Sequence, residues 1–326
     1  MVADQLDMFA GPRPARPLTI SAAPVDETTS ALANRLPAPL RMGTCGWAHP
    51  GWAGSIYEHT HPAVHLQREG LGAYAHHPLL STVTLERTRH RVPPRAQLRA
   101  LAAQTPEAFR FVAYTPYGCA CPSFGRNKPN PDFLSPQLGA RLVGELIEGL
   151  GSRLGLVLLE IPYGDPASYG GRRRVADRLA RLLAALPAGP SYALEPHDHK
   201  WIGPAYARML DETGAAACRA VHPSTPPLDE LDALATNAPL VVHWACAPRF
   251  DYESHARYLQ PFDARCQPDP DTLARLVPRI HASLTAGRPT WVLVDNLAEG
   301  CAPQSIAAIA QALVDAACPV DGPPVP

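Results

Sequence analysis

The sequence predicts an α/β protein whose strands close into a single (β/α)₈ barrel, the TIM-barrel fold. Eight apolar runs of strand length recur along the chain, and most are separated by segments with helical spacing of apolar residues. Strands that alternate with helices pair in parallel, and the chain is long enough for a closed barrel of about 250 residues or more. The expected strands are Leu40–Cys45, Leu79–Leu85, Phe109–Tyr114, Gly155–Ile161, Ser191–Glu195, Ala215–Val221, Pro239–Trp244 and Thr290–Val294.

Five segments between or after these runs have clear helical character. In one of them Leu273, Leu276, Ile280 and Leu284 recur at helical spacing, and Pro278 predicts either a kink or a later start of the helix. An open, doubly wound sheet is the alternative arrangement, but it usually carries a glycine-rich phosphate loop after its first strand, which is missing here. The expected helices are Gln137–Leu150, Arg172–Leu186, Pro204–Glu212, Asp271–Ala286 and Pro303–Ala317.

The barrel is expected over residues 39–318, between two flexible ends. Residues 1–38 are rich in Pro, Ala, Ser and Thr without periodicity, which predicts a flexible tail, and residues 319–326 predict a flexible C-terminus. Pro116–Ser135 and Ala245–Pro270 are expected to be long loops.

Composition narrows the class of protein. The formal net charge is −1 and charged residues make up 18% of the chain, so the sequence does not resemble a polycationic nucleic-acid binder, although a local basic patch remains open. None of the eight cysteines forms a C-x-x-C pair, and we find neither a signal peptide nor an apolar run of membrane-spanning length. These features predict a cytoplasmic protein with reduced thiols and no membrane association.

Carboxylates and imidazoles terminate most of the expected strands. In a parallel barrel the carboxyl ends of all strands meet at one mouth, where active sites lie. Two pairs, Thr84 with Glu86 and Glu195 with His197, are spaced by two residues, so each pair shares one face of an extended chain. The side chains expected to converge are Glu86, Glu160, Glu195, His197, His243 and Asp295.

This set of residues supports two kinds of chemistry. Glu160, Glu195, His243 and Asp295 can ligate Zn, Mn or Mg, and a bound metal can activate water or polarise a carbonyl. Alternatively, Glu160, Glu195, His197 and His243 can carry out metal-free acid–base catalysis. The remaining interpretation is that these are hydrogen-bonded polar groups without chemistry.

Further residues near the expected mouth are candidates for binding. Arg87, Arg89, His90 and Arg91 form a basic cluster suited to a phosphate or a nucleic-acid backbone, or simply to solvent. Cys45 can act as a nucleophile or as a small buried apolar residue. The residues expected to bind a small polar or phosphate-containing substrate are Thr44, Trp47, Glu86, Arg87, Tyr114, Trp244 and Asn296.

Several segments resemble the YecE-like family, known as domain of unknown function 72. The segment beginning Gly43-Thr44-Cys45-Gly46-Trp47 is similar to its "GTSGW" opening, Thr105–Phe111 to its "TPEGFRF" segment, and Ala193–Trp201 to its "VEFRHPSW" segment. Leu154–Pro162 and Val294–Asn296 also resemble family segments, so the likeness covers nearly the whole chain after the tail. The resemblance implies a TIM barrel with a polar pocket at the strand ends, and no settled reaction.

The expected pocket departs from the family pattern. Tyr114 stands in place of a lysine, Glu160 of a glutamine, His197 and His243 of arginines, and Asp295 of an asparagine. The pocket is therefore richer in carboxylate and imidazole than the family's. The chain belongs either to a branch with altered chemistry or to a branch that has lost the ancestral activity.

One segment of the tail resembles a binding motif. Gln5-Leu6-Asp7-Met8-Phe9 is similar to the pentapeptide that binds the bacterial DNA sliding clamp, with Met8 in place of leucine. A disordered peptide can become ordered when its apolar anchors enter a pocket. Binding to the clamp would link the barrel to DNA replication or repair.

Three functions are consistent with these observations. The first is a metal-assisted hydrolase, for example a phosphodiesterase that acts on nucleic acid. The second is a metal-free isomerase, epimerase or lyase that acts on a small polar substrate, with Glu195 as base and His197 or His243 as acid. The third is a non-catalytic protein that associates with the sliding clamp.

Overall fold

Eight parallel strands form a closed barrel in the computed structural model, which describes residues 20–124, 128–162, 164–234, 237–246 and 252–317. The strand order is β1-β10-β9-β8-β7-β6-β3-β2, and β1 pairs with both β10 and β2. The predicted barrel is therefore confirmed and the open sheet is wrong. The strands are β1 (Leu40–Thr44), β2 (Thr82–Leu85), β3 (Arg110–Tyr114), β6 (Leu154–Ile161), β7 (Ser191–Pro196), β8 (Ala216–Val221), β9 (Leu240–Trp244) and β10 (Thr290–Val294).

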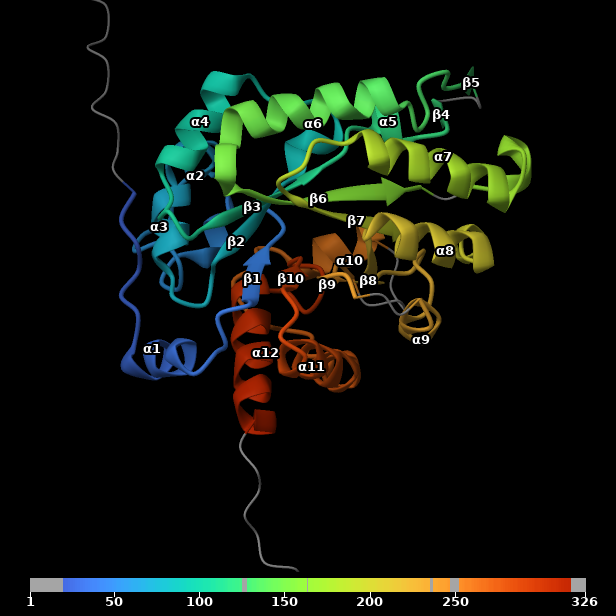
Figure 1. The fold of residues 1–326 in the computed structure, drawn as a ribbon. Helices are drawn as coiled ribbons and strands as arrows, with labels where there is room; N and C mark the ends of the chain where they lie inside the picture. The colour runs from blue at the N-terminus through green and yellow to red at the C-terminus, as the bar shows by residue number, and fades with distance from the viewer. Residues whose placement is uncertain (1–19, 125–127, 163, 235–236, 247–251, 318–326) are drawn as a thin grey trace, which may run out of the picture.

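Helices cover the outside of the barrel (Figure 1). In the view of Figure 1, α6, α7 and α8 lie along β6 and β7, and α11 and α12 lie beside β10. The helices are α1 (Glu27–Asn34), α2 (Ala63–Glu69), α3 (Leu71–His76), α4 (Arg95–Ala103), α5 (Tyr117–Ala120), α6 (Pro136–Leu150), α7 (Arg172–Ala185), α8 (Pro204–Thr213), α9 (Leu228–Asp232), α10 (Tyr252–Leu259), α11 (Pro270–Thr285) and α12 (Ala302–Ala317).

The five helices expected from the sequence are present within two residues of their expected bounds. The start of α11 is capped as the sequence indicates: the Asp269 carboxylate accepts a hydrogen bond from the Thr272 N–H at 3.0 Å. Helix α11 continues through Pro278, so the expected later start is wrong. The helix tolerates this proline because Leu276, Val277 and Ile280 bury its inner face.

Each strand has an inner and an outer face, and both are buried. On β6, Leu156 and Leu158 belong to the cluster that fills the barrel, whereas Leu154 and Val157 belong to the cluster between strands and helices. Strands buried on both faces are continuous apolar runs, which explains why the strands were visible in the sequence. The alternation also directs Glu160, two residues after Leu158, into the barrel.

The second half of the segment expected to be a flexible tail is folded. Residues 26–34 hold a capped helix, in which the Asp26 carboxylate accepts a hydrogen bond from the Thr29 N–H at 2.5 Å, and α1 packs against α12. Ala22 forms a bridge with Tyr57, and Ile20 is buried. This eight-residue helix buries no side chain fully, so its sequence carries no apolar stripe that would reveal it. Residues 1–19, with the clamp-like peptide 5–9, and residues 318–326 lie outside the described residues.

Short elements occupy the two segments expected to be loops. Residues 116–135 contain α5 and the antiparallel pair β4 (Ser123–Phe124) and β5 (Lys128–Pro129), and residues 245–270 contain α10. Among the described residues, no helix combines the length and the apolar character needed to cross a bilayer.

Candidate active site

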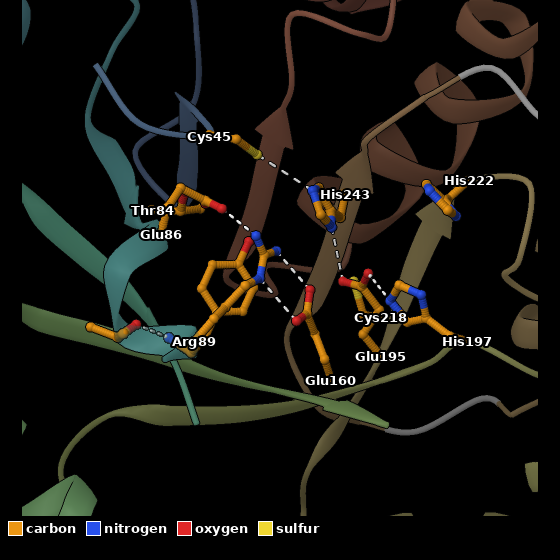
Figure 2. Close-up of polar contacts among 12 residues, drawn as sticks. Cys45, Thr84, Glu86, Arg89, Glu160, Glu195, His197, Cys218, His222 and His243 are labelled. Atoms are coloured by element: carbon orange, nitrogen blue, oxygen red, sulfur yellow. Dashed lines mark hydrogen bonds and ion pairs between the residues drawn. The ribbon is translucent and has the colours of Figure 1, made fainter. Parts of the chain in front are cut away.

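The strand register brings the acidic residues of β6 and β7 to one level of the barrel. Glu160 pairs directly with Glu195 between β6 and β7. His243 on β9 pairs with Ala220 on β8, so its imidazole lies near the same level, facing inward. Because residues that pair across parallel strands share one face of the sheet, these side chains meet inside the mouth of the barrel. The expected convergence of Glu160, Glu195 and His243 is what the structure shows (Figure 2).

Glu195 lies at the centre of the site between two imidazoles. Its Oε1 is 3.0 Å from Nε2 of His197, and its Oε2 is 2.9 Å from Nδ1 of His243. Burial alone would raise the pKa of Glu195, but His243 and His197 outweigh burial and hold this pKa well below its usual value. Burial lowers the pKa of each histidine, but the Glu195 carboxylate more than compensates and raises both. The three groups form one hydrogen-bonded network around a buried carboxylate.

The second nitrogen of His243 faces a thiol. Nε2 of His243 lies 3.4 Å from Sγ of Cys45, the residue that follows β1. Burial raises the pKa of the Cys45 thiol to about 11, although His243 favours the thiolate. Gly46 turns the chain immediately afterwards with a φ of 77° and donates its N–H to Oγ1 of Thr84 at 3.2 Å. A left-handed backbone at this position favours glycine and holds Cys45 against β9.

The second nitrogen of His197 leads to the surface. Nδ1 of His197 lies 3.1 Å from Oγ of Ser224, and this oxygen lies 2.8 Å from Nδ1 of His222. The Ser224 N–H also donates to Nδ1 of His222 at 3.1 Å, so this nitrogen carries no proton. A consistent pattern follows: His197 donates to Oγ, and the Ser224 hydroxyl donates to a neutral His222. Burial, aided by His197, lowers the pKa of His222, which agrees with the neutral form.

Arg89 organises the other half of the mouth. Its Nε donates to Oε2 of Glu160 at 2.9 Å and one terminal nitrogen donates to Oε1 at 2.6 Å, a bidentate pair. The other terminal nitrogen contacts Glu86, whose second oxygen accepts from the Thr84 hydroxyl. The guanidinium carbon lies 3.6 Å from the centroid of the Tyr114 ring, within the range of a cation–π contact. Arg89 therefore reduces the repulsion between the carboxylates of Glu86 and Glu160 at the mouth of the barrel.

Two further groups at the mouth have perturbed chemistry. Burial raises the pKa of Asp295 to about 6, although Oδ1 accepts a hydrogen bond from the Leu297 N–H at 2.9 Å. The Tyr114 side chain is fully buried, and its hydroxyl has no hydrogen-bond partner among the described residues. Burial raises the pKa of Tyr114 well above its usual value, so its hydroxyl keeps its proton.

The structure separates the expected substrate-binding residues into two groups. Trp47, Glu86 and Arg87 line a cavity of about 250 Å³ beside Cys45, and Tyr114 lies inside the barrel. The side chains of Thr44, Trp244 and Asn296 instead make contacts away from this cavity. Thr44 hydrogen-bonds to the Tyr74 hydroxyl at 2.9 Å, Trp244 belongs to the core between strands and helices, and Asn296 accepts from Trp52 and from the Ala302 N–H.

Thr44 and Trp244 lie at strand ends, but their side chains point outward. Thr44 alternates with Gly43 and Cys45 along β1, and Trp244 follows the inward His243. One residue of displacement along a strand changes the face, and the sequence alone does not show which face is inner when both are buried.

Three residues can hold a metal ion. Ligand atoms of Glu160, Glu195 and His197 all lie within 4.8 Å of one another. Carboxylate oxygen and imidazole nitrogen suit Zn or Mn, and three protein ligands leave a position open for catalysis. All three are also engaged with Arg89, His243 or Ser224, so an ion would displace some of these contacts. Glu160 and Glu195 were among the expected metal ligands. The third member of the group is His197, and the expected ligands His243 and Asp295 do not belong to it.

Several functional neighbours were not singled out from the sequence. Arg89 belonged to the noted basic cluster, but its partner Glu160 is 71 positions away and only the folded barrel brings the two together. Ser224 and Tyr117, whose hydroxyl lies 3.4 Å from Oε2 of Glu160, carried no sequence signal because isolated hydroxyls are common in loops.

Fold and site together define the class: a (β/α)₈-barrel protein with a charged pocket at the carboxyl ends of its strands. Comparison with family models identifies the family. Residues 41–325 match the model of a protein family of unknown function, DUF72, and the chain belongs to this family.

Solved structures support the same fold. A DUF72 family protein from Enterococcus faecalis V583 superposes with a TM-score of 0.59 at 14% identity, covering 84% of this chain and 95% of that chain. A DUF72 family protein from Thermotoga maritima MSB8 gives a TM-score of 0.54 at 18% identity, covering 85% and 99%. At these identities the likeness concerns the fold alone. A comparison with curated proteins found no match.

Proposed function

We propose that this protein is an enzyme that performs acid–base chemistry on a small polar substrate, as an isomerase, epimerase or lyase. One observation carries the proposal: the buried Glu195 carboxylate is held between the imidazoles of His197 and His243 at 3.0 and 2.9 Å. A carboxylate that orients an imidazole and stabilises its charged form is the usual support of a general acid or base.

His197 is the imidazole of the pair that substrate can reach. Its side chain is 24% exposed, whereas that of His243 is 6% exposed. A substrate that displaces Ser224 from Nδ1 of a neutral His197 can give this nitrogen a proton from a carbon next to its carbonyl group. The imidazolium then returns a proton to that carbon, and Glu195 supports the change of charge. Ser224 and His222 then offer a path by which the proton returns from solvent.

The rest of the mouth suits a polar substrate. Glu86 and Arg89 are 36% and 20% exposed and present an acceptor and a cation beside the imidazole. Because Arg89 is fixed by Glu160 on one side and Tyr114 on the other, it can orient a substrate without moving.

The experiment follows exchange of carbon-bound hydrogen. Aldoses, ketoses and 2-hydroxy acids are incubated with the protein in D₂O, and deuterium incorporation is measured by NMR. We expect exchange on at least one compound, and a loss of about 10²-fold or more in Glu195→Gln, since a positioned acid or base contributes on that order.

A matched variant controls for the Glu→Gln change itself. Glu148 on α6 is half exposed and pairs with Arg95 at the surface, so Glu148→Gln is expected to keep full exchange. Folding of both variants is checked by circular dichroism. Exchange on no compound, or equal exchange in Glu195→Gln and the unaltered protein, would contradict the proposal.

A second candidate function is metal-assisted hydrolysis, because Glu160, Glu195 and His197 form a group with metal-ligand spacing. Here Arg87, exposed at the edge of the mouth, would bind a phosphate. Metal content of the purified protein and hydrolysis of bis(p-nitrophenyl) phosphate with Zn²⁺ or Mn²⁺ test this alternative. Deuterium exchange that persists after chelation selects the acid–base function; phosphodiester hydrolysis that disappears on chelation selects the metal-dependent one.

A further inference from the structure

We propose that Cys45 is a nucleophile that accepts the acyl group of a small ester or thioester, with His243 as its proton partner. This goes beyond the acid–base function above, which depends on the His197 side of Glu195. The two functions share one carboxylate but use different imidazoles, so each can fail while the other stands.

The geometry is that of a nucleophile, a base and an orienting acid. Sγ of Cys45 lies 3.4 Å from Nε2 of His243, and Nδ1 of the same ring lies 2.9 Å from Oε2 of Glu195. Three elements far apart in the sequence, the end of β1, β9 and β7, supply the three groups (Figure 2). This arrangement identifies an activated nucleophile by geometry rather than by sequence order.

A cavity beside Cys45 is the expected place for a small substrate. About 250 Å³ of space lies beside Cys45, and the Cys45 side is formed by the turn through Gly46 and by Thr84 and Glu86 of the neighbouring strand end. Trp47 and Leu101 add apolar surface, while Arg87 lines the cavity with a cation. The volume suits a small substrate, and Arg87 favours one with an anionic end.

Tyr114 supplies the group that such a reaction needs for its oxyanion. Its side chain belongs to the cluster that fills the barrel, and its hydroxyl is buried without a partner among the described residues. A protonated, unpaired donor in a dry site can stabilise a developing oxyanion at little cost in reorganisation. An unpaired buried hydroxyl is costly to the folded state, and a bound substrate oxygen would remove that cost.

The reaction balances with water as the only co-reactant. In the reacting form Cys45 and His243 share a single proton between Sγ and Nε2. Sγ attacks the acyl carbon as that proton settles on Nε2 of His243, and the Tyr114 hydroxyl donates a hydrogen bond to the oxyanion. The bond to the leaving alkoxide or thiolate breaks, and that group takes the proton from Nε2. Water then attacks the thioester, giving a proton to His243, and the C–S bond breaks to release the acid and restore the thiol.

The test labels the full-length protein with p-nitrophenyl acetate and locates acetyl groups by peptide mass spectrometry. Cys301 is the internal control, because it is also buried and burial raises its thiol pKa to about 11 as well, with no imidazole in contact among the described residues. We expect Cys45 to be acetylated about 10-fold faster than Cys301 or more, given what general-base assistance contributes.

Variants separate the roles. His243→Asn is expected to slow acetylation of Cys45 about 10-fold, and His76→Asn, which changes an exposed histidine on α3, is the matched control. Because His243 is buried and its variant can fail to fold, Glu195→Gln serves as a second variant with the same expected direction. Cys45→Ser removes the label at this position.

Tyr114→Phe distinguishes the oxyanion role from a purely structural one. Acetylation passes through an oxyanion, whereas alkylation by iodoacetamide does not, so the variant is expected to slow the first reaction about 10-fold and leave the second unchanged. Equal labelling of Cys45 and Cys301, or labelling of Cys45 that is indifferent to His243→Asn and Glu195→Gln, would overturn the proposal. Neither result affects deuterium exchange through His197, which tests the acid–base function separately.

Discussion

The two ends of the barrel use their charged residues differently. At the amino end, Arg153 donates to the carbonyl oxygens of Ala102, Thr105 and Pro106, and Arg41 donates to Ala108 while lying 5.7 Å from the Trp291 ring. At the carboxyl end, charged side chains bind one another in two groups: Arg89 binds Glu160, and Glu195 binds both His197 and His243.

The difference indicates which end is built for chemistry. A cation that satisfies backbone carbonyls stabilises the fold and leaves no reactive group. Charged side chains that are buried against one another contribute little net stability, because desolvation offsets their attraction. Their concentration at one end, together with a Tyr114 hydroxyl that has no partner in the part of the chain that the structure describes, is better explained by function than by folding.

The largest effect on stability is expected at the amino end. Trp291 on β10 is buried, and Arg41 and Gly155 pack against it; a Cβ added at Gly155 would lie 2.4 Å from the Trp291 ring. Trp291→Ala is expected to lower the free energy of unfolding by about 3–5 kcal/mol, because the cavity cannot be refilled. Urea denaturation measures this change. A loss below about 1 kcal/mol would show that the amino end does not carry the core packing inferred here.

A smaller effect is expected from Arg89 at the carboxyl end. Arg89→Ala leaves Glu86 and Glu160 without their cation and should lower the free energy of unfolding by about 2 kcal/mol, less than for a fully buried pair because the groups are partly exposed. Arg89→Lys is the matched variant, because it keeps the charge but loses the bidentate geometry. Its free energy of unfolding should lie between that of Arg89→Ala and that of the unaltered protein. An unchanged urea midpoint in Arg89→Ala would contradict the stabilising role.

The fold could be predicted from the sequence to within a few residues, but the site could be predicted only in part. Glu160, Glu195, His197 and His243 were identified because carboxylates and imidazoles terminate the expected strands. Arg89, Ser224 and the pairing of Cys45 with His243 were not, since each depends on which strands become neighbours when the barrel closes. Thr44 and Trp244 were assigned to the mouth because sequence shows a strand's end but not its inner face.

The buried Asp295 carboxyl group is expected to lower the free energy of unfolding when it is ionised. Its pKa is raised to about 6 by burial, above the unfolded value of about 3.9, so the folded state binds the proton more tightly. Asp295 therefore destabilises the protein progressively as the pH rises from the unfolded pKa through the folded pKa. Asp295→Asn should raise the free energy of unfolding by about 1 kcal/mol near pH 8 and by almost nothing near pH 3.5.

The measurement is a pair of urea titrations at each pH. The expected signature is a difference between variant and unaltered protein that grows with pH and levels off above about pH 7. A variant that is equally destabilised at both pH values would show instead that Asp295 acts through its hydrogen bond with Leu297.

The smallest effect on the barrel is expected from the tail. We keep as a proposal that Gln5-Leu6-Asp7-Met8-Phe9 binds a bacterial sliding clamp. Leu6→Ala with Phe9→Ala should abolish capture of the protein by an immobilised clamp and leave the urea midpoint unchanged. Glu195→Gln is the converse control, expected to bind the clamp as the unaltered protein does. Equal clamp binding by the Leu6→Ala/Phe9→Ala variant would remove this link to DNA replication or repair.

The sequence by itself determined the barrel and the chemical character of its mouth. Apolar runs of strand length, helical spacing between them and polar residues at the strand ends are local patterns, and local patterns can be read from neighbouring residues alone. Closure of the barrel decided the rest: which side chains touch, which carboxylate is shared by two imidazoles, and which thiol meets His243. These contacts join positions up to 198 residues apart, and only the pairing of strands fixes such distances.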